Sequence, residues 1–190
     1  MRTMIVLIAA LMLVPLVASA QAPAGTVTEI RPFVGAFLPS GQNRGLLKEA
    51  VLGGAQVALQ LNENVHLLGS VAWSPTREKP RNVNNRLDLY QYDVGAELMA
   101  PRPLPNGGQF SPFVGIGAGG RTYHLRDADV SAQTHFTGYG ALGGEFKSDR
   151  FGLRIEARDY VSRFTGLTGN ESASARNDFA VLAGLAIHLW

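Results

Sequence analysis

The sequence has 190 residues, no cysteine and a formal net charge of +2. Without cysteine, disulfides, thiolate chemistry and attachment of a lipid to a cysteine are excluded. The basic residues are scattered singly, without a basic run or an aromatic-interleaved basic stripe, which argues against nucleic-acid binding.

Residues 1–20 predict a cleaved secretory signal peptide. Arg2 precedes the apolar run "MIVLIAALMLVPLVA", and the small residues at 18–20 form a cleavage site before Gln21. The apolar run is about 15 residues long, whereas a membrane-spanning helix needs roughly 20. We therefore expect residues 21–190 to form one exported domain.

The mature chain predicts eight β-strands with alternating short and long connections. The turns at 62–64 and 147–150 are tight. The connection at 101–109 is long where the pattern predicts a short turn, and its prolines make it stiff, so we expect a proline-stiffened excursion from the barrel. The four long links at 39–50, 75–85, 126–134 and 165–177 fall at one end of an up-and-down meander. The predicted strands are approximately 28–38, 51–61, 65–74, 86–99, 110–125, 135–146, 151–164 and 178–190.

Most of these strands alternate between an apolar row and a polar row, as side chains on opposite faces of a sheet do. In the stretch "FGLRIEARDY", Phe151, Leu153, Ile155 and Ala157 alternate with Arg154, Glu156 and Arg158. A soluble barrel such as a lipocalin would bury the apolar row, whereas an outer-membrane barrel turns it to lipid.

Three features favour the membrane orientation. Glycines share the polar row, and a narrow barrel interior needs small residues. The charges on this row balance, as enclosed charges must, because breaking a buried ion pair costs about 3–5 kcal/mol. The signal peptide, the long strands and the final Trp190 fit an exported barrel. The predicted interior charge network comprises Arg31, Asp93, Glu97, Arg121, Glu145, Arg154, Glu156 and Arg158, and the predicted interface aromatics are Tyr90, Tyr92 and Trp190.

Four stretches carry a resemblance to the outer-membrane β-barrel domain family, the small OmpA/OmpX-type barrels. They are "RPFVGAFLPSG" (31–41), "SPFVGIGAGG" (111–120), "GALGGEFKSDRFGLRIEARDY" (140–160) and the last strand ending at Trp190. The resemblance implies an all-β, eight-stranded, antiparallel, up-and-down transmembrane β-barrel in the cell outer membrane. Trp190 departs from the family pattern, because it lies out of phase with the apolar row that ends at Leu189.

For function, we expect a monomeric structural or surface-interaction protein in the lipid bilayer, without a cofactor or metal and without enzymatic activity. The four long links would contact an extracellular ligand or partner. A salt-bridged polar interior is expected rather than an open pore, since eight strands leave room for side chains only. One alternative is a minor gated channel, in which Arg154 and Glu156 exchange partners.

A second alternative is a lipid-modifying enzyme that uses the segment 124–135. This segment holds His124, Asp127, Asp129, Ser131 and His135, which are residue types found in nucleophilic triads and metal sites. Their spacing matches no known motif, so a polar loop between two histidines is the favoured interpretation. A glycosidase-like pair of Glu156 with Glu97 or Asp93 is disfavoured, because adjacent arginines predict salt bridges.

Overall fold

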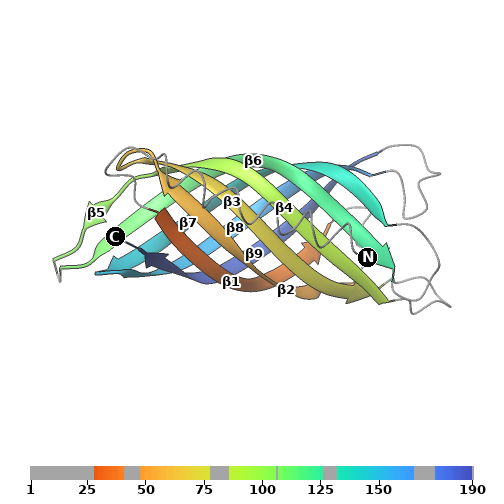
Figure 1. Cartoon of the computed structure of the whole chain (residues 1–190), viewed down its shortest axis with the longest axis horizontal. Helices are drawn as coiled ribbons and strands as arrows, with labels where there is room; N and C mark the ends of the chain where they lie inside the picture. The colour runs from red at the N-terminus through yellow and green to blue at the C-terminus, as the bar shows by residue number, and fades with distance from the viewer. Residues whose placement is uncertain are drawn as a thin grey trace.

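The computed structural model describes residues 28–40, 48–77, 86–105, 107–125, 132–164 and 174–189. Eight long antiparallel strands form one sheet in which chain neighbours pair, and β1 pairs with β9 to close the barrel (Figure 1). The strands are β1 (Thr28–Pro39), β2 (Ala50–Gln60), β3 (Val65–Arg77), β4 (Arg86–Met99), β6 (Gln109–Leu125), β7 (Gln133–Ser148), β8 (Phe151–Phe164) and β9 (Ser174–His188).

The eight predicted strands are confirmed, with ends that differ by a few residues. The largest shift is in β9, which begins at Ser174 rather than at 178. The predicted excursion at 101–109 contains a short strand, β5 (Arg102–Pro103), which pairs with the start of β6. We call the end of the barrel with the connections at 61–64, 100–108 and 149–150 the turn end, and the opposite end the loop end. β5 and the last residues of β9 lie at the turn end (Figure 1).

The two faces of the sheet have opposite character. Large apolar side chains point outward, among them Ile116 at 72% exposure, Val51 at 71% and Phe136 at 70%. Arginines and glutamates of the other row are buried inside, with Arg31 and Arg121 each 1% exposed. A closed sheet with an apolar outer face suits hydrocarbon, where every backbone N–H and C=O needs a partner within the protein. Across the described ranges, no helix is both long enough and apolar enough to cross a membrane.

Glycines on the inner row leave room for the backbone and side chains of the neighbouring strands. A Cβ atom at Gly119 would clash with the backbone oxygen of Tyr92, and one at Gly117 would clash with the ring of Tyr139. Close packing between neighbouring strands on the inner face thus explains why glycine occupies the same row as the charges.

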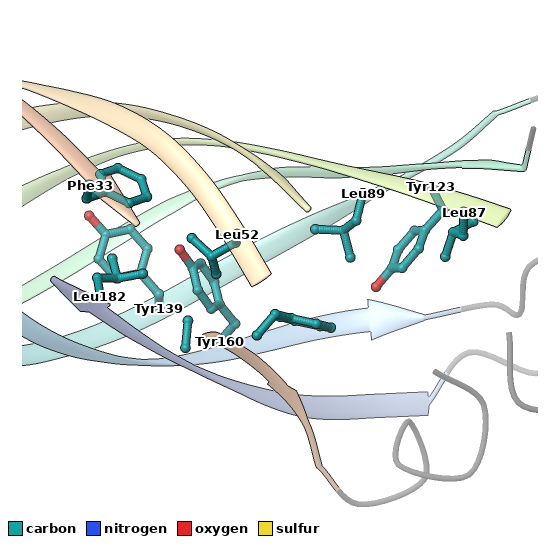
Figure 2. Close-up of a cluster of buried hydrophobic side chains, with 10 residues drawn as sticks. Phe33, Leu52, Leu87, Leu89, Tyr123, Tyr139, Tyr160 and Leu182 are labelled. Atoms are coloured by element: carbon teal, nitrogen blue, oxygen red, sulfur yellow. The ribbon is translucent and has the colours of Figure 1, made fainter. Parts of the chain in front are cut away.

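The interior has two tiers, which the sequence analysis did not distinguish. The predicted polar network runs from the turn end past the centre. A cluster of apolar side chains, the apolar tier (Figure 2), extends from the centre toward the loop end and surrounds the Arg121–Asp178 pair of this network. The apolar tier also contains tyrosine rings, and the ring centroids of Tyr139 and Tyr160 lie 5.6 Å apart. Its buried members are Phe33, Phe37, Leu52, Leu87, Leu89, Tyr123, Tyr139, Tyr160, Ala180 and Leu182.

Candidate functional site

The candidate site is the charged interior of the barrel. All eight charged residues selected from the sequence lie there, each with at most 5% of its surface exposed. Glu29 and Asp178, which the sequence analysis did not select, are buried beside them. Among the buried interior side chains described, six carboxylates therefore face four guanidinium groups, and the imidazoles of His66 and His188 also lie beside these carboxylates.

The network begins at the turn end, around Arg31 of β1. Its guanidinium group lies 2.7 Å from the carboxylate of Glu29 and 3.2 Å from that of Glu97 on β4. Arg31 also donates a hydrogen bond to Nδ1 of His66 at 3.1 Å. His188, near the end of β9, lies 3.3 Å from Glu29. This cluster links four strands through charge-assisted contacts, which are stronger than neutral hydrogen bonds.

Arg154 of β8 holds the centre of the network. It forms ion pairs with Glu97, with Glu156 at 3.2 Å and with Glu145 at 3.6 Å. Its guanidinium carbon also lies 3.5 Å from the centroid of the Phe113 ring, within the range of a cation–π contact. The positive charge of this one arginine is thus shared by three carboxylates, which come from β4, β7 and β8.

Arg158 carries the network toward the loop end. It pairs with Glu156 on its own strand and with Asp93 on β4 at 3.3 Å, and it donates to the hydroxyl of Tyr160 at 3.0 Å. Tyr160 in turn donates to Asp93 at 3.2 Å. The arginine side chain is therefore fixed from several directions, which favours a single arrangement of the network.

The network ends at Arg121 of β6. Its Nε donates to Gln91 at 2.6 Å, its Nη1 pairs with Asp178 at 2.5 Å, and its guanidinium group faces the ring of Phe37. Gln91 donates to Asp93 at 2.6 Å, which connects Arg121 to the central pairs. Polar contacts therefore run from the turn end into the apolar tier, where the rings of Phe37 and Tyr160 flank the Arg121 guanidinium group.

Because both side chains lie on the inner row of β8, the sequence predicts that Arg154 and Arg158 each pair with an acid on a neighbouring strand. Arg154 does so through Glu145 on β7. For Arg158 this expectation is wrong, because its acids lie on its own strand and on β4 across the interior. In a barrel this narrow, a long arginine side chain reaches the opposite wall as readily as the adjacent strand.

The parity of the strands carried a signal for the two acids that were missed. Glu29 lies two residues before Arg31 and shares its face, and Asp178 shares the inner row of β9 with Ala180. The disfavoured glycosidase-like pair is not a separate site, since Glu97 and Glu156 both contact Arg154, as the predicted salt bridges require. In the described part of the chain, no group of three His, Cys, Asp or Glu residues has a metal-binding arrangement.

The two histidines of the segment 124–135 lie on opposite faces of the sheet. His124 is exposed on the outer face of β6, whereas His135 is 7% exposed on the inner face of β7, with its ring 5.7 Å from that of Tyr123. The described residues therefore do not bring the two imidazoles together. Asp127, Asp129 and Ser131 lie outside the described residues.

Aromatic side chains occur on the outer face toward both ends of the barrel. Tyr90 and Tyr92 lie on the outer face of β4, as the sequence predicts, while Trp190 lies outside the described residues. Three further outer-face aromatics were not predicted from the sequence. Trp73 donates from Nε1 to Asp88 at 3.0 Å, and Phe110 and Phe146 at the turn end have ring centroids 4.5 Å apart. Their outward parity would have identified them.

Comparisons with solved structures agree with this architecture. The chain is similar to the crystal structure of Neisserial surface protein A, with a TM-score of 0.63 and 11% identity over 84% of this chain and 96% of that one. The fold is that of the small eight-stranded outer-membrane β-barrels. The outer membrane protein OprG from Pseudomonas aeruginosa gives a TM-score of 0.57 and 12% identity over 89% of this barrel and 98% of its own chain.

No protein-family model matches the sequence, and no curated protein matches it significantly. Identities of 11% and 12% establish the fold alone. The function of this barrel must therefore be argued from its own residues.

Proposed function

We propose that this protein is a monomeric structural or surface-interaction barrel of the outer membrane, with a closed interior and no enzymatic activity. The observation that carries the proposal is the filling of the interior by the charge network and the apolar tier. Two cavities among the described residues measure about 20 and about 10 Å³. A single water needs roughly 10–15 Å³ of such space, so these cavities are far from a continuous aqueous path.

The proposed contact surface comprises the four long connections at the loop end. Most of their residues lie outside the described ranges, so support for this role comes from their length and polar composition. Exposed loops on a rigid scaffold are common binding elements. The partner would be an extracellular molecule or surface, and removal of one loop at a time should abolish binding without loss of the folded barrel.

Conductance in planar bilayers tests the closed interior. We expect the wild-type barrel to give no regular current steps. The alternative of a minor gated channel predicts steps in the wild type whose size or frequency changes in Arg154→Ala and Glu156→Ala. Regular steps of this kind would contradict the proposed closed interior.

A lipid-turnover assay tests the proposed lack of enzymatic activity. The placement of His124 and His135 on opposite faces favours a packing role for His135. We expect wild type and His135→Ala to leave lipid A and phospholipid unchanged at the same background rate. Turnover by the wild type that is lost in His135→Ala would contradict the proposal.

A further inference from the structure

The connection between β4 and β6 extends the wall of the barrel beyond the turn end. The last pair between β4 and β6 joins Met99 to Phe113. Three residues further along both strands, β5 and β6 join Arg102 to Phe110, so the register is unchanged. β5 therefore continues the course of β4 and pairs with β6 alone, as a projection at the turn end (Figure 1).

Arg102 lies on the outer face of this projection, beside an aromatic pair. Residues opposite each other in a ladder share a face, so Arg102 and Phe110 point the same way. Phe110 pairs in turn with Phe146 of β7, which is 54% exposed on the outer face, and the two ring centroids are 4.5 Å apart. Arg102 is itself exposed. We call Arg102, Phe110 and Phe146 the turn-end row.

The turn-end row lies where the hydrocarbon of a bilayer meets its headgroups. Leu98 of β4 is 58% exposed on the outer face, and Arg102 follows it by four residues on the same face. The rise and tilt of barrel strands place Arg102 roughly 10 Å beyond Leu98 along the barrel axis. A headgroup layer is roughly 5–7 Å thick, and aromatic rings gather at its inner boundary. The guanidinium group of Arg102 therefore lies at the level of the phosphates.

Arg102 is held firmly and has donors to spare. Pro101 and Pro103 flank it and fix the backbone on both sides, and Leu104 N–H donates to the oxygen of Gly108 at 2.8 Å. Within the described ranges, no residue accepts a hydrogen bond from the Arg102 guanidinium group or forms an ion pair with it. The prolines alone hinder pairing of another strand with this edge, so edge protection does not require the arginine.

We propose that the turn-end row binds the phosphodiester of a phospholipid in the leaflet at the turn end. The guanidinium group of Arg102 donates to the phosphate oxygens in a forked contact, and the acyl chains lie against Phe110 and Phe146. A phospholipid is the occupant because the row joins a cation at headgroup level to apolar rings at the hydrocarbon boundary. A phospholipid carries its negative charge and its hydrocarbon in the same order, whereas a soluble phosphate would gain nothing from the rings.

Lipid binding by the folded barrel in uncharged maltoside micelles tests this proposal. Dimyristoyl phosphatidylglycerol is titrated in, and native mass spectrometry counts the lipids bound. We expect the first lipid to bind more tightly than the rest, and Arg102→Gln to weaken it about tenfold, which corresponds to about 1.4 kcal/mol. The projection lies beyond the barrel, so the variant should keep the heat-modifiable gel mobility of a folded barrel.

Arg150→Gln is the matched control for the loss of a positive charge at the same end. Arg150 is exposed in the turn before β8, directly after the carboxylate of Asp149. We expect its removal to leave binding of the first lipid unchanged. An equal loss in both variants would overturn the proposal, because it would show attraction to net charge alone, and so would unchanged binding in Arg102→Gln.

Two further variants test the fork and the rings. Arg102→Lys keeps the charge without the planar fork and should bind more weakly than wild type, and equal binding would contradict the forked contact. Phe146→Ala should weaken binding about threefold, the effect of losing roughly 30 Å² of apolar contact. Phe151→Ala removes another exposed turn-end ring that does not lie on the row, and should leave binding unchanged. Equal effects of the two ring variants would contradict a role for the row.

Soluble competitors distinguish a phospholipid from a free phosphate. Inorganic phosphate and glycerophosphorylglycerol are added at the concentration at which the lipid saturates the first site. We expect neither to displace the lipid, because neither has acyl chains to contact Phe110 and Phe146. Displacement of the lipid by either compound at this concentration would overturn the assignment of a phospholipid to the turn-end row.

Discussion

Arg154→Met removes the central cation of the interior while keeping a long apolar side chain against the Phe113 ring. The side chain of Arg154 is 4% exposed and is shared by Glu97, Glu145 and Glu156. The buried interior would then hold six carboxylates against three guanidinium groups instead of four. Breaking one buried pair typically costs about 3–5 kcal/mol, so we expect the free energy of unfolding to fall by about that amount.

Equilibrium unfolding by urea in detergent micelles or lipid vesicles measures this change, with heat-modifiable gel mobility to report the folded barrel. Arg150→Met, in the exposed turn before β8, is the matched control and should change stability by less than about 0.5 kcal/mol. Adding Glu97→Gln to Arg154→Met should recover part of the loss, because one unmatched carboxylate is removed. A loss below about 1 kcal/mol, the value of an exposed pair, would refute the view that the interior depends on this arginine.

Three further predictions concern the lipid face, the glycine row and the apolar tier. Ile116→Arg places a charge on the middle of the outer face of β6 and should destabilise the barrel in lipid by about 2–4 kcal/mol. Urea unfolding in vesicles measures this change, and an unchanged free energy of unfolding would contradict the membrane orientation. Gly117→Ala should destabilise the barrel by about 1–3 kcal/mol and lower the folded fraction in heat-modifiable gels, because its Cβ would meet the Tyr139 ring. Gly53→Ala has open space around its Cβ and should fold normally, so equal folded fractions of the two variants would refute the packing argument. Phe37→Ala should leave a cavity in the apolar tier and cost about 3–5 kcal/mol in the same unfolding assay, and a change below about 1 kcal/mol would show that the tier is loosely packed.

Local patterns in the sequence determined the strands and their faces. Alternation with a period of two depends only on neighbouring residues, so it identified β8 from its own ten-residue stretch and selected the eight charged residues that the structure places inside. Closure into a barrel followed from the apolar outer row, since an open edge in hydrocarbon would leave backbone groups without partners.

Only the tertiary structure decided which inner residues meet. The pairing of Arg158 with Asp93 joins β8 to β4, and that of Arg121 with Asp178 joins β6 to β9. These contacts depend on the stagger of the closed sheet and on the width of the interior, which alternation along one strand does not contain. The same reason explains why the apolar tier appears only in the folded barrel: it is formed by strands whose relative register is fixed by closure.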